Sequence, residues 1–190
     1  MTNSNHWLRK YTNLIKGVEL TGPNQVFVSD ITYLRIPGGF VYLSLITDAW
    51  SRKIVGWDVS SSLCVQGTLR ALNMALSNVP NPEGLIHHSD RGIQYCCSDY
   101  VDLLKQNNIL ISMKEDNHCY ENAIAERVNG ILKDEFYLNI TLPSLKIAKE
   151  LVKDSIYIYN NKRRHMSLKY NIPADVHDAS LKKTVNFFQD

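Results

Sequence analysis

The period of the hydrophobic pattern changes once along this chain, and that change limits the folds it can adopt. The first third contains three runs rich in Val, Ile, Thr and aromatic residues, at 25–36, 39–47 and 53–59. Only the short breaks at 37–39 and 50–52 separate them. Short breaks join antiparallel strands, because a parallel connection needs about a dozen residues or more. The pattern therefore predicts an antiparallel meander of three strands.

Beyond the meander, the apolar residues recur with the 3.6-residue period of an α-helix. They do so over 65–79, over 121–137 and over 144–160, and a further helix is expected near 98–106. Short apolar runs at 85–88 and 109–113 predict two more strands, the second completing a strand–helix–strand unit. This order indicates an α/β fold with a mixed five-stranded sheet flanked by helices.

The chain has 190 residues, enough for one core that needs neither disulfides nor a structural metal. We expect an N-terminal arm over 1–24, a core domain over 25–178 and a tail over 179–190. The apolar runs are too short to span a membrane, and the first residues do not resemble a signal peptide. We therefore expect a cytoplasmic protein whose four cysteines are reduced.

Charge is unevenly distributed along the chain. Residues 81–140 carry 5 basic and 10 acidic side chains, whereas residues 141–190 carry 9 basic and 5 acidic ones. A carboxylate-rich middle beside a basic segment suits a metal-dependent site next to a surface that binds a polyanion. Two solvated helix faces of opposite sign would give the same totals, so charge alone leaves both interpretations open.

Three acidic residues occupy positions that suit a metal-binding carboxylate. Asp30 interrupts an apolar strand, where an isolated carboxylate is costly unless it is paired or metal-bound. Asp90 follows the run at 85–88, and α/β sheets commonly carry functional groups at strand ends. Glu126 lies on the polar face of the helix expected at 121–137, with 35 residues between it and Asp90. Mg²⁺ prefers such oxygens, and two ions about 3.5–4 Å apart can support phosphoryl transfer.

Spacing alone would also fit surface carboxylates or helix caps, but five sequence strings carry a family resemblance. They are Val28–Tyr33, Asp48–Gly56, Gly84–Gly92, Cys119–Glu126 and Tyr159–His165. In this order and with this spacing they resemble the integrase-type, retroviral-integrase-like catalytic core of bacterial insertion-sequence transposases. The resemblance extends from Pro23 to Val176.

The resemblance implies a ribonuclease-H-like fold and an Asp-Asp-Glu active site made of Asp30, Asp90 and Glu126. It implies a DNA transposase that cuts a strand to expose a 3′ hydroxyl and joins that end to another phosphodiester. The implied cofactor is a pair of Mg²⁺ ions, with Mn²⁺ as a substitute. The implied partner is DNA, both transposon ends and target, bound by a homo-oligomer at the nucleoid. Lys133 fills the family's basic position seven residues after the glutamate.

We predict DNA contacts from polar and basic residues near the triad and after the last expected helix. They are Lys133, Asn129, Asn122, Arg127, Arg91, Arg163 and Arg164. The sequence departs from the family pattern at Glu121, where Asp is usual, and at Arg127, where a small residue is common. The second departure leaves the local DNA contact open. A solvated helix C-terminus would also explain the basic cluster at 162–165.

Two other functions stay open at this stage. One is a ribonuclease-H-like nuclease that hydrolyses nucleic acid without strand transfer, and the other is an inactive DNA-binding remnant of a transposase. The family usually places a helix-turn-helix region upstream, and no segment before Gln25 is long enough for one. We therefore expect a catalytic core without the domain that recognises a specific DNA sequence.

Histidine and cysteine pairs raise the alternative of a zinc site. They are His87-His88, Cys96-Cys97 and His118-Cys119. Structural zinc sites usually separate paired ligands by two to four residues, so adjacent pairs argue against zinc. We expect both histidines of the first pair to complete a strand, and Cys64 and Cys96 to act as small apolar side chains. Asp48 is expected to cap a turn rather than bind metal.

Overall fold

A computed structural model describes residues 6–115 and 123–186, with side chains described up to residue 179. One mixed sheet has the strand order β3-β2-β1-β4-β5. Its strands are β1 Val26–Ile36, β2 Gly39–Asp48, β3 Ile54–Ser60, β4 Ile86–Ser89 and β5 Leu110–Met113. The first three pair antiparallel, and β4 pairs parallel with β1 and with β5. The predicted α/β fold is confirmed.

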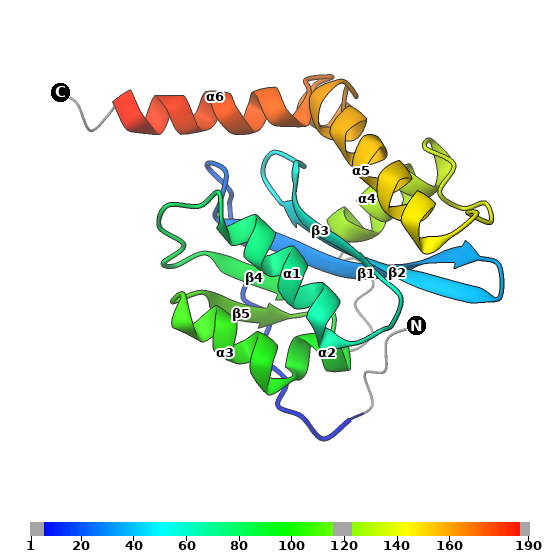
Figure 1. Cartoon of the computed structure of the whole chain (residues 1–190). Helices are drawn as coiled ribbons and strands as arrows, with labels where there is room; N and C mark the ends of the chain where they lie inside the picture. Colours follow the sequence, from blue (N-terminus) through cyan, green and yellow to red (C-terminus); the bar gives the residue numbers. More distant parts are fainter. Residues whose placement is uncertain (1–5, 116–122, 187–190) are drawn as a thin grey trace.

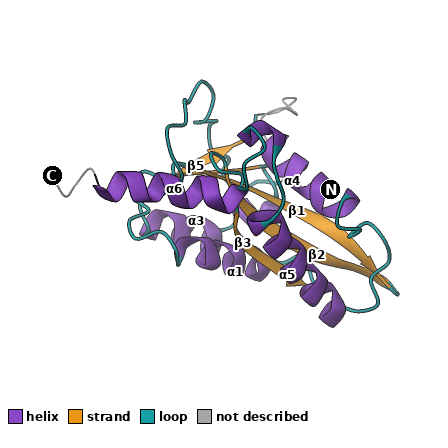
Figure 2. Ribbon diagram, turned by 90° about the horizontal axis from the view of Figure 1, so that it is seen from above, coloured by secondary structure: helices purple, strands orange, loops and turns teal. Residues whose placement is uncertain are grey.

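Helices cover both faces of this sheet. They are α1 Val65–Leu76, α2 Ile93–Cys96, α3 Ser98–Gln106, α4 Ala123–Asp134, α5 Leu145–Asn161 and α6 Pro173–Asn186, with a 3₁₀ turn at Met166–Leu168. Figures 1 and 2 show α1 and α3 on one face and α4 and α5 on the other, with α6 extending past the sheet. Among the described residues, no helix is both long and apolar enough to cross a membrane.

The hydrophobic period does not predict α2 or α6. Four residues are too few for α2 to show a period. Helix α6 begins at Pro173, a residue that favours the first turn of a helix, and it continues through residue 178 without a break. The division between a core ending at 178 and a tail starting at 179 stays a prediction.

Alternation along β1 assigns each of its residues to one face of the sheet. Phe27 and Ile31 belong to the apolar cluster under α1 and α3. Val26 and Val28 pack instead with Ala125 of α4. Because successive side chains of a strand point to opposite faces, Asp30 shares the α4 face with Val26 and Val28.

The segment before β1 lies against β5, the edge strand of the sheet. The Thr12 carbonyl accepts the Met113 N–H at 3.4 Å, and Ser112 Oγ accepts the Leu14 N–H at 2.8 Å. Leu8 and Tyr11 pack on the cluster under α1 and α3. Part of the expected arm therefore packs on the same fold as the core.

His87 and His88 lie in β4, which confirms the predicted strand, and both side chains are buried. His87 Nε2 lies 2.7 Å from Ser29 Oγ and 2.8 Å from Tyr100 Oη, and burial lowers the pKa of His87 to about 3. This imidazole is therefore neutral at pH 7. The buried Cys96 also matches its prediction, whereas the prediction for Cys64 is wrong because that side chain is exposed beside the start of α1.

Asp48 ends β2 as a fully buried carboxylate. Its Oδ1 accepts hydrogen bonds from the Ser51 N–H at 2.7 Å and Oγ at 2.6 Å, while Oδ2 accepts the Asn24 N–H at 2.7 Å. His177 Nδ1 of α6 lies 3.8 Å from Oδ1. The expected turn-capping role is confirmed, and the same carboxylate also connects the β2–β3 turn with the segment before β1.

Gly56 allows α1 to pack directly on β3. A Cβ atom at this position would lie 2.1 Å from the Ala71 carbonyl oxygen and 2.9 Å from the Ala75 Cβ. Because backbone cannot move aside cheaply, we expect Gly56→Ala to lower the free energy of unfolding by about 1–3 kcal/mol or more. Urea unfolding measures this change.

Gly130 of α4 provides the matched control for that substitution. A Cβ atom there would meet no heavy atom within 4 Å. Gly130→Ala should be neutral or stabilise the helix by up to about 1 kcal/mol. Equal effects of the two substitutions would show that the contact between α1 and β3 is looser than described.

Candidate active site

Strand pairing places Asp30 and Asp90 next to each other. In the parallel ladder of β1 and β4, Val26 lies opposite Ile86 and Val28 lies opposite His88, each partner 60 positions further along the chain. Asp90 comes two residues after His88, just past the end of β4, so this register brings it close to Asp30 of β1. The effect of the Asp90 charge on the pKa of Asp30 agrees with this proximity.

Glu126 reaches this end of the sheet from helix α4. Its side chain is exposed in the first turns of the helix, and the preceding Ala125 packs with Val26 and Val28. That apolar contact holds the start of α4 against the strand that carries Asp30. A helix and two strands, far apart in sequence, thus place three acidic residues in one region.

The pKa of Asp30 shows that these charges interact. The pKa of Asp30 is raised from 3.8 to about 6, mostly by burial, next by the Asp90 carboxylate and least by Glu126. The Ile31 N–H and the Asn129 amide oppose the rise by hydrogen bonding to the carboxylate. Ionising all three acids is therefore unfavourable without a nearby positive charge.

The donor chemistry of these residues fits a hard divalent cation, because carboxylate oxygens are its preferred ligands. Across residues 6–115 and 123–186, however, no three His, Cys, Asp or Glu side chains already form a group that could hold a metal ion. Asp30, Asp90 and Glu126 are close enough for their charges to interact, but they are not arranged as a complete metal-ligand set.

Asn129 contacts the candidate site from the same helix as Glu126. Its Nδ2 donates a hydrogen bond to Asp30 Oδ2 at 2.7 Å, and only 6% of the residue is exposed. Its Oδ1 is buried and has no hydrogen-bond partner in the described part of the chain. The sequence predicts a DNA contact for Asn129 and does not indicate its burial against Asp30, because the docking of α4 on β1 creates this contact.

The other residues predicted to contact DNA differ in their surroundings. Lys133 is half-buried on α4, two turns beyond Glu126, and Arg91 follows Asp90 directly. Arg163 forms a two-pronged ion pair with Glu135, with both N···O distances at 2.6 Å. Arg164 Nη1 donates to the Tyr170 carbonyl at 3.2 Å.

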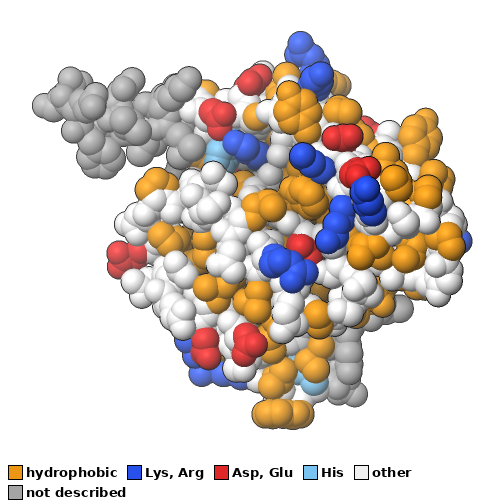
Figure 3. All heavy atoms as spheres, in the orientation of Figure 1, with side chains coloured by type: hydrophobic (Ala, Val, Ile, Leu, Met, Phe, Trp, Pro, Cys, Tyr) orange, Lys and Arg blue, Asp and Glu red, His pale blue; other side chains and the backbone are white. Residues whose placement is uncertain are grey.

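Arg127 is exposed and makes no hydrogen bond or ion pair with another described residue. Four residues singled out in the sequence lie outside the described ranges: His118, Cys119, Glu121 and Asn122. On the face that Figure 3 shows, lysines and arginines are interspersed with acidic and hydrophobic side chains, and no continuous basic surface forms there.

Comparison with known protein families shows to which family this chain belongs. An integrase core domain profile matches residues 21–119, which include both aspartates, and a second integrase core domain profile matches residues 107–173, which include Glu126. The chain belongs to the integrase core domain family. The resemblance seen in the sequence is confirmed.

Relatives of this integrase core include insertion-sequence proteins of enteric bacteria. The chain is 39% identical over 175 residues to the "Insertion element IS600 uncharacterized 31 kDa protein" of Shigella sonnei, covering 91% of this chain and 64% of that protein. It is 40% identical over 146 residues to "Transposase InsF for insertion sequence IS3A" of Escherichia coli (strain K12), covering 76% and 51% respectively. The chain therefore spans between about half and two thirds of these relatives.

Solved structures confirm the integrase core fold. An intasome of simian T-cell lymphotropic virus, solved with the PP2A regulatory subunit B56 gamma, superposes with a TM-score of 0.72 at 17% identity, over 93% of this chain and 60% of that one. The HTLV-2 integrase catalytic core domain in complex with magnesium gives a TM-score of 0.64 at 16% identity, over 82% and 97%. At such identities the similarity demonstrates the shared fold.

The raised pKa of Asp30 predicts a pH-dependent stability of this integrase core without metal. The folded state binds the Asp30 proton more tightly than the unfolded state, so stability falls as pH rises from about 4 to about 6 and stays lower above it. Asp30→Asn removes this ionisation. In EDTA, the melting temperature of the variant relative to the unsubstituted chain should therefore increase between pH 4 and pH 8. A constant difference across this range would contradict the assigned pKa.

Proposed function

We propose that this chain is the catalytic core of a DNA transposase, which cleaves a DNA strand and transfers the exposed 3′ end to a second phosphodiester. The observation that carries the proposal is the location of Asp30 on β1 and of Asp90 just past the end of the paired strand β4, with the charges of Asp90 and Glu126 both acting on Asp30. Membership in the integrase core family and the similarity to a transposase support it.

Each residue has a distinct task in the proposed reaction. Asp30, Asp90 and Glu126 would hold two Mg²⁺ ions, which supply Lewis-acid activation of the phosphodiester and the attacking hydroxyl when bound. Asn129 would orient the Asp30 carboxylate by its hydrogen bond to Oδ2. The magnesium present in the HTLV-2 core structure supports this choice of ion.

DNA would approach the carboxylates over basic residues nearby. Its phosphates would be contacted by Lys133, Arg91, Arg127 and Arg164. Such contacts do not depend on the base sequence of the DNA. We therefore propose salt-sensitive DNA binding that is nearly independent of sequence, by a homo-oligomer in the active complex.

A strand-transfer assay tests the proposed reaction. The chain is incubated with Mg²⁺ or Mn²⁺, precut duplexes that carry a free 3′ hydroxyl, and a plasmid target. Plasmid covalently joined to the duplex supports a transposase core. Hydrolysis without joined product would instead identify a ribonuclease-H-like nuclease, and DNA binding without either reaction would identify an inactive remnant.

Metal binding can be tested apart from activity. At pH 8, Mg²⁺ should raise the melting temperature of the unsubstituted chain, because a cation relieves the repulsion among the three carboxylates and binds only the folded state. Asp90→Asn should respond less, with KCl of equal ionic strength as the control. An equal rise for both proteins would place the bound ion elsewhere.

A further inference from the structure

A cavity of about 280 Å³ lies beside the candidate active site, between α4, the β2–β3 turn and the segment after α5. Basic and apolar side chains line it together. We call it the arginine pocket and define it by Arg52, Arg127, Arg163 and His165. Every fully charged residue that lines it is a cation. Arg127 follows Glu126 directly in α4, so one helical turn contributes to both sites.

The cations of the arginine pocket are only partly neutralised. Glu135 pairs with Arg163 and holds its guanidinium in place. Arg52 has one side-chain hydrogen bond to a described residue, from Nη1 to the Ala49 carbonyl at 2.6 Å, and burial lowers the pKa of its guanidinium. The charge of Asp48 acts on Arg52, but the guanidinium forms no ion pair with a described residue. A partly desolvated arginine in this state favours the binding of an anion.

His165 is a second, independent indication that the arginine pocket binds a ligand. It is 7% exposed, and its Nδ1 lies 2.9 Å from Ser167 Oγ, whereas its buried Nε2 has no hydrogen-bond partner within the described residues. Burial lowers the pKa of His165, and the charges of Arg163, Arg52 and Arg127 lower it further. A neutral imidazole that accepts the Ser167 hydroxyl at Nδ1 carries its proton at Nε2 and can donate it to an anion.

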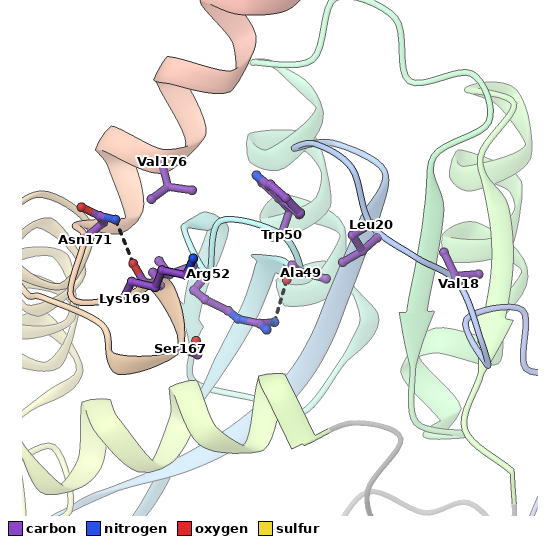
Figure 4. A pocket seen from close by; sticks show the side chains of 10 residues that line it. Val18, Leu20, Ala49, Trp50, Arg52, Ser167, Lys169, Asn171 and Val176 are labelled. Atoms are coloured by element: carbon purple, nitrogen blue, oxygen red, sulfur yellow. Dashed lines mark hydrogen bonds between the residues drawn. The ribbon is translucent and has the colours of Figure 1, made fainter.

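The arginine pocket continues into a larger cavity of about 510 Å³, which shares Arg52 and Ser167 with it. Figure 4 shows Arg52 near Ser167 and Lys169, with Trp50 and Leu20 along the opposite side. Cations next to apolar and aromatic side chains match the two components of a nucleic-acid strand, which are charged phosphates and apolar base faces.

We propose that the arginine pocket binds a phosphodiester of the DNA strand that extends beyond the candidate active site. This inference rests on the proposed function, because it assumes that DNA occupies the carboxylates next to Glu126. It adds a specific subsite in which Arg52, Arg127 and Arg163 neutralise one phosphate and His165 Nε2 donates a hydrogen bond to it.

Arg127 is the residue to substitute, because it is exposed and has no partner among the described residues whose loss would unfold the chain. Arg127→Gln should weaken DNA binding and reduce the slope of log Kd against log salt concentration by about one phosphate contact. Arg127→Lys should recover most of that slope. Arg35→Gln removes another exposed arginine, which lies outside the pocket, and is the matched control.

A methylphosphonate scan locates the phosphate. Single phosphodiesters of the DNA are replaced by uncharged methylphosphonates, and affinity is measured for the unsubstituted chain and for Arg127→Gln. One position should weaken binding to the unsubstituted chain several-fold and weaken binding to the variant clearly less, because the variant has already lost one contact to that phosphate. Equal losses for both proteins at every position would overturn the proposal.

Two further results separate the possible failures. If the unsubstituted chain joins DNA normally but the scan shows no coupling to Arg127, the arginine pocket proposal fails and the proposed function stands. If inorganic phosphate raises the melting temperature of the chain but not of Arg127→Gln, while DNA shows no coupling, the pocket binds a free anion and its assignment to DNA is wrong. If the chain neither binds nor joins DNA, both proposals fall.

Discussion

Asp30→Asn, Asp90→Asn and Glu126→Gln should each reduce DNA cleavage and joining by about a thousand-fold or more while the chain stays folded. Each substitution removes a negatively charged oxygen from the proposed metal-binding site. The loss of one acid would therefore displace the metal ions that the other two acids hold. Two like charges, on Asp90 and Glu126, act on Asp30. Its replacement by a neutral amide removes this repulsion, so we expect the substituted chain to stay folded. Gel assays of cleaved and joined DNA measure the loss, and circular dichroism verifies the fold.

The control for these substitutions is Asp102→Asn, which neutralises an exposed aspartate on α3, on the opposite face of the sheet. It should leave both reactions unchanged. DNA binding by Glu126→Gln should persist, because phosphate contacts by basic residues are separate from the carboxylates. Near-normal turnover by any of the three substituted proteins would remove that acid from the mechanism.

Asp48→Ala should be among the most destabilising single substitutions in this chain. The carboxylate is fully buried and accepts hydrogen bonds from Asn24 and from both the backbone and the hydroxyl of Ser51. Each buried donor left without an acceptor costs about 1–3 kcal/mol, so we expect a loss of about 3–5 kcal/mol in the free energy of unfolding. Urea unfolding at pH 7 measures it.

Asp178→Ala is the matched control, because this aspartate pairs with Lys53 at the surface and is 57% exposed at its side chain. Exposed ion pairs contribute about 1 kcal/mol or less. Asp48→Asn retains one acceptor oxygen and should lie between the two alanine variants. A loss below about 1 kcal/mol for Asp48→Ala would mean that water satisfies the donors, and that the carboxylate does not fasten the turn.

The local sequence was sufficient to predict most of the secondary structure. Period-two runs correspond to β1, β2 and β3, and the 3.6-residue period corresponds to α1, α4 and α5. These patterns can be read from the sequence because spacing along the chain determines which residues share one face of a strand or helix. The ordered motifs by themselves also indicate Asp30, Asp90 and Glu126 as candidate site residues, and their catalytic role stays a prediction.

Only the tertiary structure decided how those residues meet. The parallel pairing of β1 with β4 brings Asp90 close to Asp30, and the docking of α4 brings Asn129, 99 positions away, to the Asp30 carboxylate. The ion pair of Arg163 with Glu135 and the gathering of cations in the arginine pocket likewise join separate helices. No period or short motif encodes such contacts, because they depend on strand register and helix docking, which the packing of the whole core determines.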